Sequence, residues 1–225
     1  MTGSQSGAQA GAQSGAQAGA PAGDMHPIER RSFEILASRV DLSELTAGVR
    51  QVVGRVVHAT ADIGFATSLV LDEAAVDAGT RALAGDAVVV CDAEMVRAGL
   101  GGLDARCFLG AVEAGPGGFP TRSARAMRHA ADRHPTGALV VVGCAPTALE
   151  AVIDLMEAGS FRPALVVGLP VGFVGAAESK VRLRRAAQST GLPAISNVGE
   201  RGGSAAACGA VNALKRMAMR PEGLR

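Results

Sequence analysis

Apolar residues in the first part of the chain recur at helical spacing. Five valines fall at positions i, i+3, i+4, i+7 and i+8, namely Val49, Val52, Val53, Val56 and Val57. Such a stripe predicts an amphipathic helix with one buried face. His26-Pro27 is expected to open a helix before it, and Ser43 is expected to cap the striped helix. A third helix is expected to begin at Asp72 and to end near Gly85.

The rhythm changes from residue 86 onward. Short apolar runs rich in β-branched residues now alternate with helical stretches, and the predicted strands are 87–91, 106–110, 138–142, 164–168 and 193–197. Strands that alternate with helices indicate βα units and a parallel sheet. The runs are apolar on both faces, as expected for a sheet that helices cover on both sides. We therefore predict an α/β fold: a three-layer α/β/α domain with a mostly parallel sheet of about five strands and a helical N-terminal region.

The first 23 residues form a different kind of segment. They contain the imperfect repeat GAQSGAQAGA, carry no charge and have no large apolar residue beyond Met1. Such a tract cannot bury enough surface to offset its ordering entropy, so disorder is expected there. It lacks the basic and apolar regions of a signal peptide. The remaining residues, 24–225, are expected to form one domain of ordinary size.

Charge and composition exclude several classes of function. Acidic and basic residues nearly balance, with a net charge of +1, and the chain has no Trp and no Tyr. General nucleic-acid binders show a basic excess, and single-strand binders add stacking aromatics, so neither is expected. The apolar runs are too short to cross a membrane. The four cysteines show no CxxC spacing and the histidines no HExxH pattern, so we expect reduced cytosolic thiols and no metal site.

Candidate ligand-binding residues lie beyond the carboxyl ends of the predicted strands. Ligands bind at this edge of open α/β sheets, which points to Asp92, Gly143, Leu169, Asn197 and the loops that follow them. Glycines such as Gly172 in the loop 168–175 let a ligand approach the backbone. The spacing there is neither G-x-G-x-x-G nor a P-loop, so a nucleotide-dependent enzyme is disfavoured. A tight turn without a ligand is an equal alternative for this loop.

Three further segments contain candidate anion contacts. Arg201 follows the last predicted strand, and Ser204 is expected to cap the final helix. Thr147 is expected to cap the helix after the loop that begins at Gly143. Arg122 stands near a helix start, where a basic group opposes the helix dipole, so an anionic partner is one interpretation and a solvated side chain the other.

His58 lies near the C-terminal end of the valine-striped helix and beside the stripe. A helix C-terminus favours the imidazolium form. A histidine poised between its two forms can act as a general acid or base. On composition alone, a histidine without a role is the simpler interpretation.

Taken together, these segments are more specific than each one alone. The motifs are Arg31-Ser32-Phe33, Val57-His58-Ala59, Asp92-Ala93-Glu94-Met95-Val96, Thr121-Arg122-Ser123, GxAPTAL at 143–149, GLPVGFVGAAESK at 168–180 and Arg201-Gly202-Gly203-Ser204. In this order they resemble the precorrin-8X methylmutase family across residues 25 to 217. The stretch from Gly110 to Pro120 matches only loosely, and the N-terminal tail lies outside the match.

The resemblance implies an activity and a set of site residues. The family moves a methyl group between neighbouring carbons of a corrin-type macrocycle, a formal 1,5-sigmatropic shift that converts precorrin-8, or its cobalt form, in cobalamin biosynthesis. It implies an enzyme without metal or redox cofactor, cytoplasmic and typically homodimeric. His58 matches the family's catalytic histidine, which protonates the macrocycle, and Ser32 matches a substrate-binding serine. The substrate's carboxylates suggest contacts from Arg31, Arg122, Gly172, Lys180, Arg201 and Ser204. A corrinoid carrier without catalysis is the main alternative.

Overall fold

The computed structural model describes residues 26–118 and 120–219. The predicted disordered tail, residues 1–23, lies outside the described residues. The helices are α1 (Pro27–Arg39), α2 (Ala47–Thr60), α3 (Phe65–Ser68), α4 (Glu73–Ala84), α5 (Glu94–Ala98), α6 (Arg122–Arg133), α7 (Pro146–Glu157), α8 (Ala176–Thr190) and α9 (Ser204–Ala218), with short 3-10 turns η1 (Leu109–Ala111) and η2 (Pro116–Gly118). The strands are β1 (Leu69–Val70), β2 (Val89–Cys91), β3 (Ala105–Cys107), β4 (Leu139–Val142), β5 (Leu165–Gly168) and β6 (Ala194–Asn197).

The strands form one sheet in the order β1-β6-β5-β4-β2-β3. The pairs from β3 through β2, β4 and β5 to β6 are parallel, which confirms the predicted mostly parallel sheet. β1 adds a sixth strand, antiparallel to β6, with Leu69 opposite Asn197. Two residues are too few to show an alternating pattern in the sequence. The strand predicted at 106–110 is shifted, because the chain turns into η1 directly after β3.

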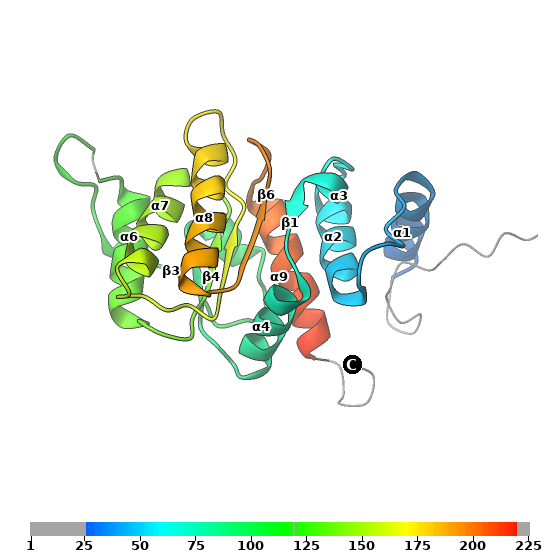
Figure 1. Cartoon of the computed structure of the whole chain (residues 1–225), viewed down its shortest axis with the longest axis horizontal. Helices are drawn as coiled ribbons and strands as arrows, with labels where there is room; N and C mark the ends of the chain where they lie inside the picture. The colour runs from blue at the N-terminus through cyan, green and yellow to red at the C-terminus, as the bar shows by residue number, and fades with distance from the viewer. Residues whose placement is uncertain (1–25, 119, 220–225) are drawn as a thin grey trace, which may run out of the picture.

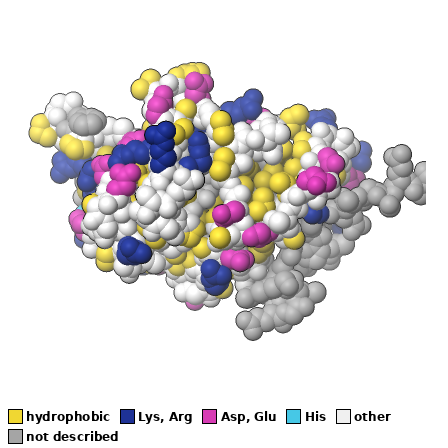
Figure 2. All heavy atoms as spheres, viewed as in Figure 1, with side chains coloured by type: hydrophobic (Ala, Val, Ile, Leu, Met, Phe, Trp, Pro, Cys, Tyr) yellow, Lys and Arg dark blue, Asp and Glu magenta, His cyan; other side chains and the backbone are white. Residues whose placement is uncertain are grey.

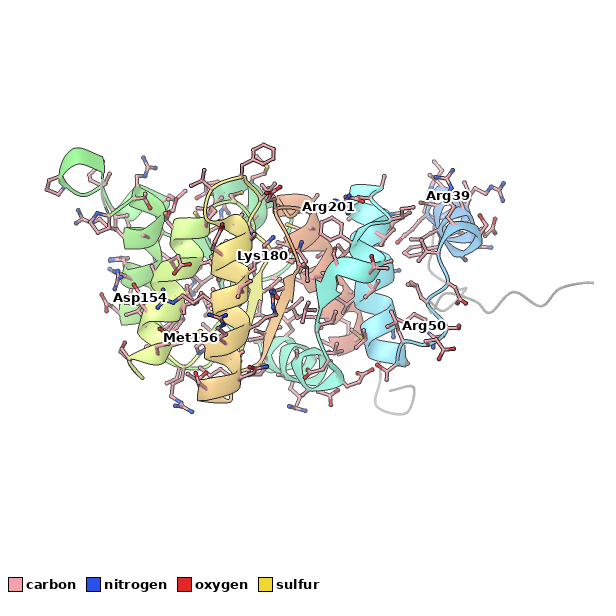
Figure 3. The ribbon with its side chains drawn as sticks, turned by 45° about the horizontal axis from the view of Figure 1, so that its top comes forward. Arg39, Arg50, Asp154, Met156, Lys180 and Arg201 are labelled. Atoms are coloured by element: carbon pink, nitrogen blue, oxygen red, sulfur yellow. The ribbon has the colours of Figure 1, made fainter. Side chains whose placement is uncertain are left out.

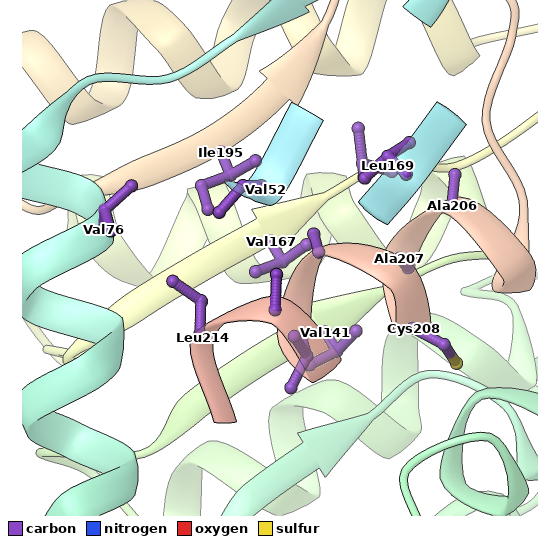
Figure 4. Close-up of a cluster of buried hydrophobic side chains, with 14 of the residues drawn as sticks. Val52, Val76, Val141, Val167, Leu169, Ile195, Ala206, Ala207, Cys208 and Leu214 are labelled. Atoms are coloured by element: carbon purple, nitrogen blue, oxygen red, sulfur yellow. The ribbon is translucent and has the colours of Figure 1, made fainter. Parts of the chain in front are cut away.

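Helices cover both faces of the sheet, as predicted. Figure 1 shows α6, α7 and α8 on one side and α4 and α9 on the other, with α2 outside α9 and α1 outermost. Each face has its own buried cluster, because successive strand side chains point to opposite sides. Val140 and Val166 belong to the α6–α8 side, whereas Val141 and Val167 belong to the α4–α9 side. Figure 4 shows part of the second cluster, in which side chains of α9 lie against those of β4 and β5.

The valine stripe packs α2 onto α9 rather than onto the sheet. Val52 and Val56 have no exposed surface, and Val53 and Val57 are almost as deeply buried. Gly209 of α9 faces this stripe. A Cβ atom at Gly209 would lie 3.2 Å from the Cα of Val56 and 3.3 Å from the carbonyl oxygen of Arg55. The helices therefore approach so closely that a side chain at 209 would force them apart.

Two of the predicted helix caps are present. The Nδ1 of His26 accepts a hydrogen bond from the backbone N–H of Ile28 at the start of α1. A carboxylate oxygen of Asp72 accepts one from the N–H of Ala75, 2.8 Å away, and α4 ends at Gly85 as predicted.

Three other caps predicted from the sequence are wrong, because each helix begins at another residue than the pattern suggests. The residue before α2 is Thr46, not Ser43, and the Glu73 carboxylate of α4 accepts from the N–H of Gly48 at 3.0 Å. Thr147 lies inside α7, and its hydroxyl forms a hydrogen bond with that of Thr121. Ser204 is the first residue of α9, after Gly203.

Candidate active site

Ser32 of α1 and His58 of α2 face each other across the two helices. The Ser32 hydroxyl lies 2.9 Å from Nδ1 of His58. The ring of Phe33 stacks on the imidazole, with 4.8 Å between centroids and 8° between planes. The stacking and the hydrogen bond together fix the orientation of the imidazole, and the hydrogen bond engages its Nδ1 atom. The other ring nitrogen, Nε2, is left for a further partner. The sequence comparison assigned these two side chains separately, and the structure brings them into contact.

Burial and the charged groups around His58 lower its pKa below the ordinary value of 6.5. Burial is the main cause, and the Arg55 guanidinium adds to it, while the Glu29 carboxylate acts in the opposite direction. Arg216 also lowers the pKa. Desolvation and the two cations therefore act against the imidazolium form that the end of α2 was expected to favour.

Arg55 and Arg216 both bind the carboxylate of Glu29. Arg55 of α2 forms an ion pair with Glu29 of α1, and Arg216 of α9 donates to the same oxygen at 2.9 Å. Burial alone would raise the pKa of Glu29, but the hydrogen bonds from the two arginines outweigh it and lower the pKa. The sequence analysis missed Glu29 and Arg216. Helical spacing offered a signal, because Glu29 precedes Ser32 by three residues and Arg55 precedes His58 by three.

Arg201 lies between the sheet and α2, as Figure 3 shows. Its guanidinium pairs with Asp62, with 3.3 Å between Nε and Oδ2, and its side chain is more than half exposed. The second Asp62 oxygen accepts from the N–H of Gly64 at 2.8 Å. This ion pair joins the turn after His58 to the loop between β6 and α9. Asp62 was not identified from the sequence.

Lys180 does not lie where the sequence comparison suggested. It has no exposed surface, and its Nζ donates to Oδ1 of Asn197 at 3.0 Å and to the carbonyl oxygen of Arg201 at 2.6 Å. The Asn197 amide donates to the same carbonyl at 2.9 Å. Burial, with a smaller effect of Arg184, lowers the Lys180 pKa to about 8. Lys180 thus holds the backbone of Arg201 through a buried hydrogen bond. This arrangement favours a structural role for Lys180 over a direct contact with the substrate.

The other predicted contacts follow the carboxyl edge of the sheet or the surface of α1. The N–H of Gly172 donates to the carbonyl of Glu200, which ties the loop after β5 to the loop after β6. Ser204 points its hydroxyl toward Sδ of Met95, 3.0 Å away. Arg122 is exposed at the first turn of α6. Arg31 is exposed on α1 and pairs with Glu34 there, at 2.9 Å.

Asp92, directly after β2, forms hydrogen bonds within the protein and does not face solvent. Its carboxylate accepts hydrogen bonds from the backbone N–H groups of Gly143, Cys144 and Ala145, at 2.7 to 3.0 Å. The side chain is 1% exposed, and burial raises its pKa against the effect of these bonds. Asp92 therefore shapes the loop between β4 and α7, directly before the first residue of the helix.

The loop between β5 and α8 carries large apolar side chains in solvent. Val171, Phe173 and Val174 are 49%, 90% and 88% exposed. Figure 2 shows apolar atoms at the top of the view, where this loop stands. Such a cluster at the carboxyl edge of the sheet is suited to a flat apolar ligand or a protein surface.

Comparison with known proteins identifies the family. The sequence model of the precorrin-8X methylmutase family matches residues 27–217. The chain belongs to the precorrin-8X methylmutase family. It is therefore assigned to the methylmutases, isomerases of cobalamin biosynthesis.

Relatives of this methylmutase carry two names. Precorrin-8X methylmutase of Pseudomonas aeruginosa is 41% identical, over 85% of this chain and 95% of the relative. Cobalt-precorrin-8 methylmutase of Methanothermobacter thermautotrophicus is 38% identical, over 85% and 93%. The crystal structure of precorrin-8x methyl mutase from Thermus thermophilus matches with a TM-score of 0.75 at 34% identity, covering 85% of this chain and 95% of that one.

The described part of the chain contains neither a metal-binding cluster nor a membrane-spanning helix. In residues 26–118 and 120–219, no group of three or more His, Cys, Asp and Glu side chains is arranged to hold a metal ion. Among the helices of the same residues, none is both long and apolar enough to cross a membrane.

Proposed function

We propose that this chain rearranges precorrin-8, or its cobalt form, by moving a methyl group between neighbouring carbons of the macrocycle. The observation that supports this most directly is the His58 imidazole, held by the Ser32 hydroxyl on one nitrogen and by Phe33 on one face. A catalytic acid needs a fixed orientation and a free nitrogen, and His58 has both.

His58 acts as the general acid in this proposal. A proton passes from the imidazolium to the macrocycle and makes its conjugated system electron-poor. The bond from the methyl group to its first carbon then breaks as the bond to the neighbouring carbon forms. The proton finally returns to the imidazole, so the reaction is an isomerisation without net gain or loss of atoms. A positioned acid contributes roughly 10²- to 10⁴-fold to such a step.

The carboxylates of the substrate would meet the carboxyl edge of the sheet. Arg201 and Arg122 supply charged donors there, and Ser204 and the Gly172 backbone supply neutral ones. Arg31 would add a contact from α1. The exposed apolar side chains of the β5–α8 loop, Phe173 among them, would cover a face of the ring. Lys180 enters this scheme only as support for the Arg201 backbone.

We also propose that the enzyme is a homodimer in the cytosol. The exposed Val171, Phe173 and Val174 would be covered by a second copy or by substrate, and light scattering of the purified protein tests the dimer. All four cysteines are unpaired, two of them buried, which suits a reducing compartment.

An anaerobic assay by visible spectroscopy tests the function. Wild type and H58A are incubated with precorrin-8 and, separately, with cobalt-precorrin-8, and the product spectrum is followed. We expect the wild type to convert at least one substrate and H58A to be slower by about 10²-fold or more. H129A is the control, because His129 lies on α6 and accepts from Arg133 at the surface. If the wild type binds the pigment unchanged, the chain is a carrier and the proposal fails.

A further inference from the structure

Two contacts between α1 and α2 have the same spacing along the chain. Glu29 binds Arg55 and Ser32 binds His58, each 26 residues apart. Residues three apart lie on the same face of a helix. The ion pair and the serine–histidine pair are therefore neighbouring links between the same two helix faces, and the position of one affects the position of the other.

Helix α1 depends on few contacts for its place. Figure 1 shows it at one end of the molecule, outside α2. Leu36 is its one buried residue, while Ile28 and Ile35 are 75% and 38% exposed. An amphipathic helix with so little buried apolar surface gains little from packing. Polar links therefore add to the contacts of Leu36 and Phe33 in fixing the register of α1 on α2.

Glu29 ties α1 to two helices of the body at once. Arg55 comes from α2 and Arg216 from α9, and both reach Oε1 of Glu29. The side chains are partly buried, with 22% of Glu29 and 25% of Arg55 exposed. A carboxylate held from two directions fixes both the rotation and the translation of α1 at this point.

We propose that Glu29 is a positioning residue, which holds α1 against α2 and α9 so that the Ser32 hydroxyl stays on Nδ1 of His58. The inference rests on the proposed role of His58 as the acid. With Ser32 in place the imidazole keeps one orientation, and its Nε2 faces the substrate. Without Glu29, Ser32 and Phe33 leave the imidazole together, because both are carried by α1.

Glu29 also balances charge around His58. The charged groups that act on the imidazole are Glu29 from α1, Arg55 from α2 and Arg216 from α9. Removing the negative one leaves two cations beside the ring. The pKa of His58 then falls further, and less imidazolium is present at neutral pH.

Two substitutions of Glu29 separate these effects. E29Q keeps an amide oxygen that can accept from both arginines but removes the charge, so the His58 pKa should fall while the contact with Ser32 persists. E29A removes the link itself. NMR titration of the imidazole in the free protein measures the pKa, and the ¹⁵N shift of Nδ1 reports the hydrogen bond. We expect E29A to move this shift to the value found in S32A.

The matched control is E34Q. Glu34 is a surface carboxylate of the same helix whose ion pair, with Arg31, stays within α1. It should leave the His58 pKa and the Nδ1 shift unchanged. If E29Q leaves the pKa at the wild-type value, and E29A leaves the Nδ1 shift there, Glu29 does not position His58 and the inference is overturned. No substrate is needed, so this result stands apart from the success or failure of the proposed function.

Turnover provides the second test. E29A should lower kcat by about tenfold to a hundredfold, because a small displacement of a catalytic group costs this much. In an S32A background the same substitution should cost far less, since the contact that it protects is already gone. Equal losses in both backgrounds would mean that Glu29 acts independently of Ser32, and would refute the mechanism.

Discussion

Lys180 allows a quantitative test of the buried hydrogen bonds that hold the backbone of Arg201. Replacement by Met keeps most of the aliphatic side chain and removes the charge and both hydrogen bonds. The Arg201 carbonyl keeps its donor in Asn197, so K180M is expected to fold. Wild type and variant then differ mainly in one titrating group at the centre of the protein.

The magnitude follows from the pKa of this lysine. Burial lowers it from 10.5 to about 8 in the folded protein. Between these values the unfolded chain binds more protons than the folded one, so the free energy of unfolding rises with pH. At about 1.4 kcal/mol per pH unit, the wild type should gain about 3 kcal/mol relative to K180M between pH 7 and pH 10.5.

The assay is urea denaturation of both proteins at several pH values in this range, under reducing conditions. Few other groups interfere, because the chain has one further lysine, Lys215, and no tyrosine. Burial raises the pKa of the Cys91 and Cys208 thiols, which lowers stability at high pH, but equally in both proteins. If the free energy of unfolding of the wild type minus that of K180M stays constant or falls as the pH rises, Lys180 is not buried as described.

Two further substitutions test the packing that positions the site. D92A should lower the free energy of unfolding by about 3 kcal/mol, because one buried and two partly buried backbone N–H groups lose their acceptor, and urea denaturation measures this change. D104A, at an exposed carboxylate, should change the same free energy by less than about 0.5 kcal/mol. G209V should cost about 1–3 kcal/mol through the contact of α9 with α2, with A205V on the exposed side of α9 as the control. Equal melting of a variant and its control would contradict the packing.

Much of the fold could be predicted because hydrophobic periodicity is a local signal. The valine stripe predicted α2, and the runs rich in β-branched residues predicted the parallel strands. The two-residue strand β1 was not predicted, because its pairing with β6 depends on the rest of the sheet and not on its own sequence pattern. The strand at 105–107 ended early because η1 begins two residues later.

Helix caps show the limit of local reasoning. Asp72 was predicted correctly, because its carboxylate reaches an N–H three residues away. Ser43 was wrong because Glu73, distant in sequence, accepts from the first-turn N–H groups of α2, and Thr147 was wrong because it lies inside the first turn of α7, where its hydroxyl pairs with that of Thr121. A cap from another element leaves no trace in the residues next to the helix.

The sequence by itself determined the alternation of helices and parallel strands and the family, and it singled out Ser32 and His58 as candidate site residues, because periodicity and motifs are written in neighbouring positions. Only the tertiary structure decided that Ser32 touches His58, that Glu29 joins three helices and that Lys180 faces inward. The same structure reversed the expected effect on the His58 pKa. Contacts, burial and electrostatic shifts depend on residues that meet only after folding, so no local pattern encodes them.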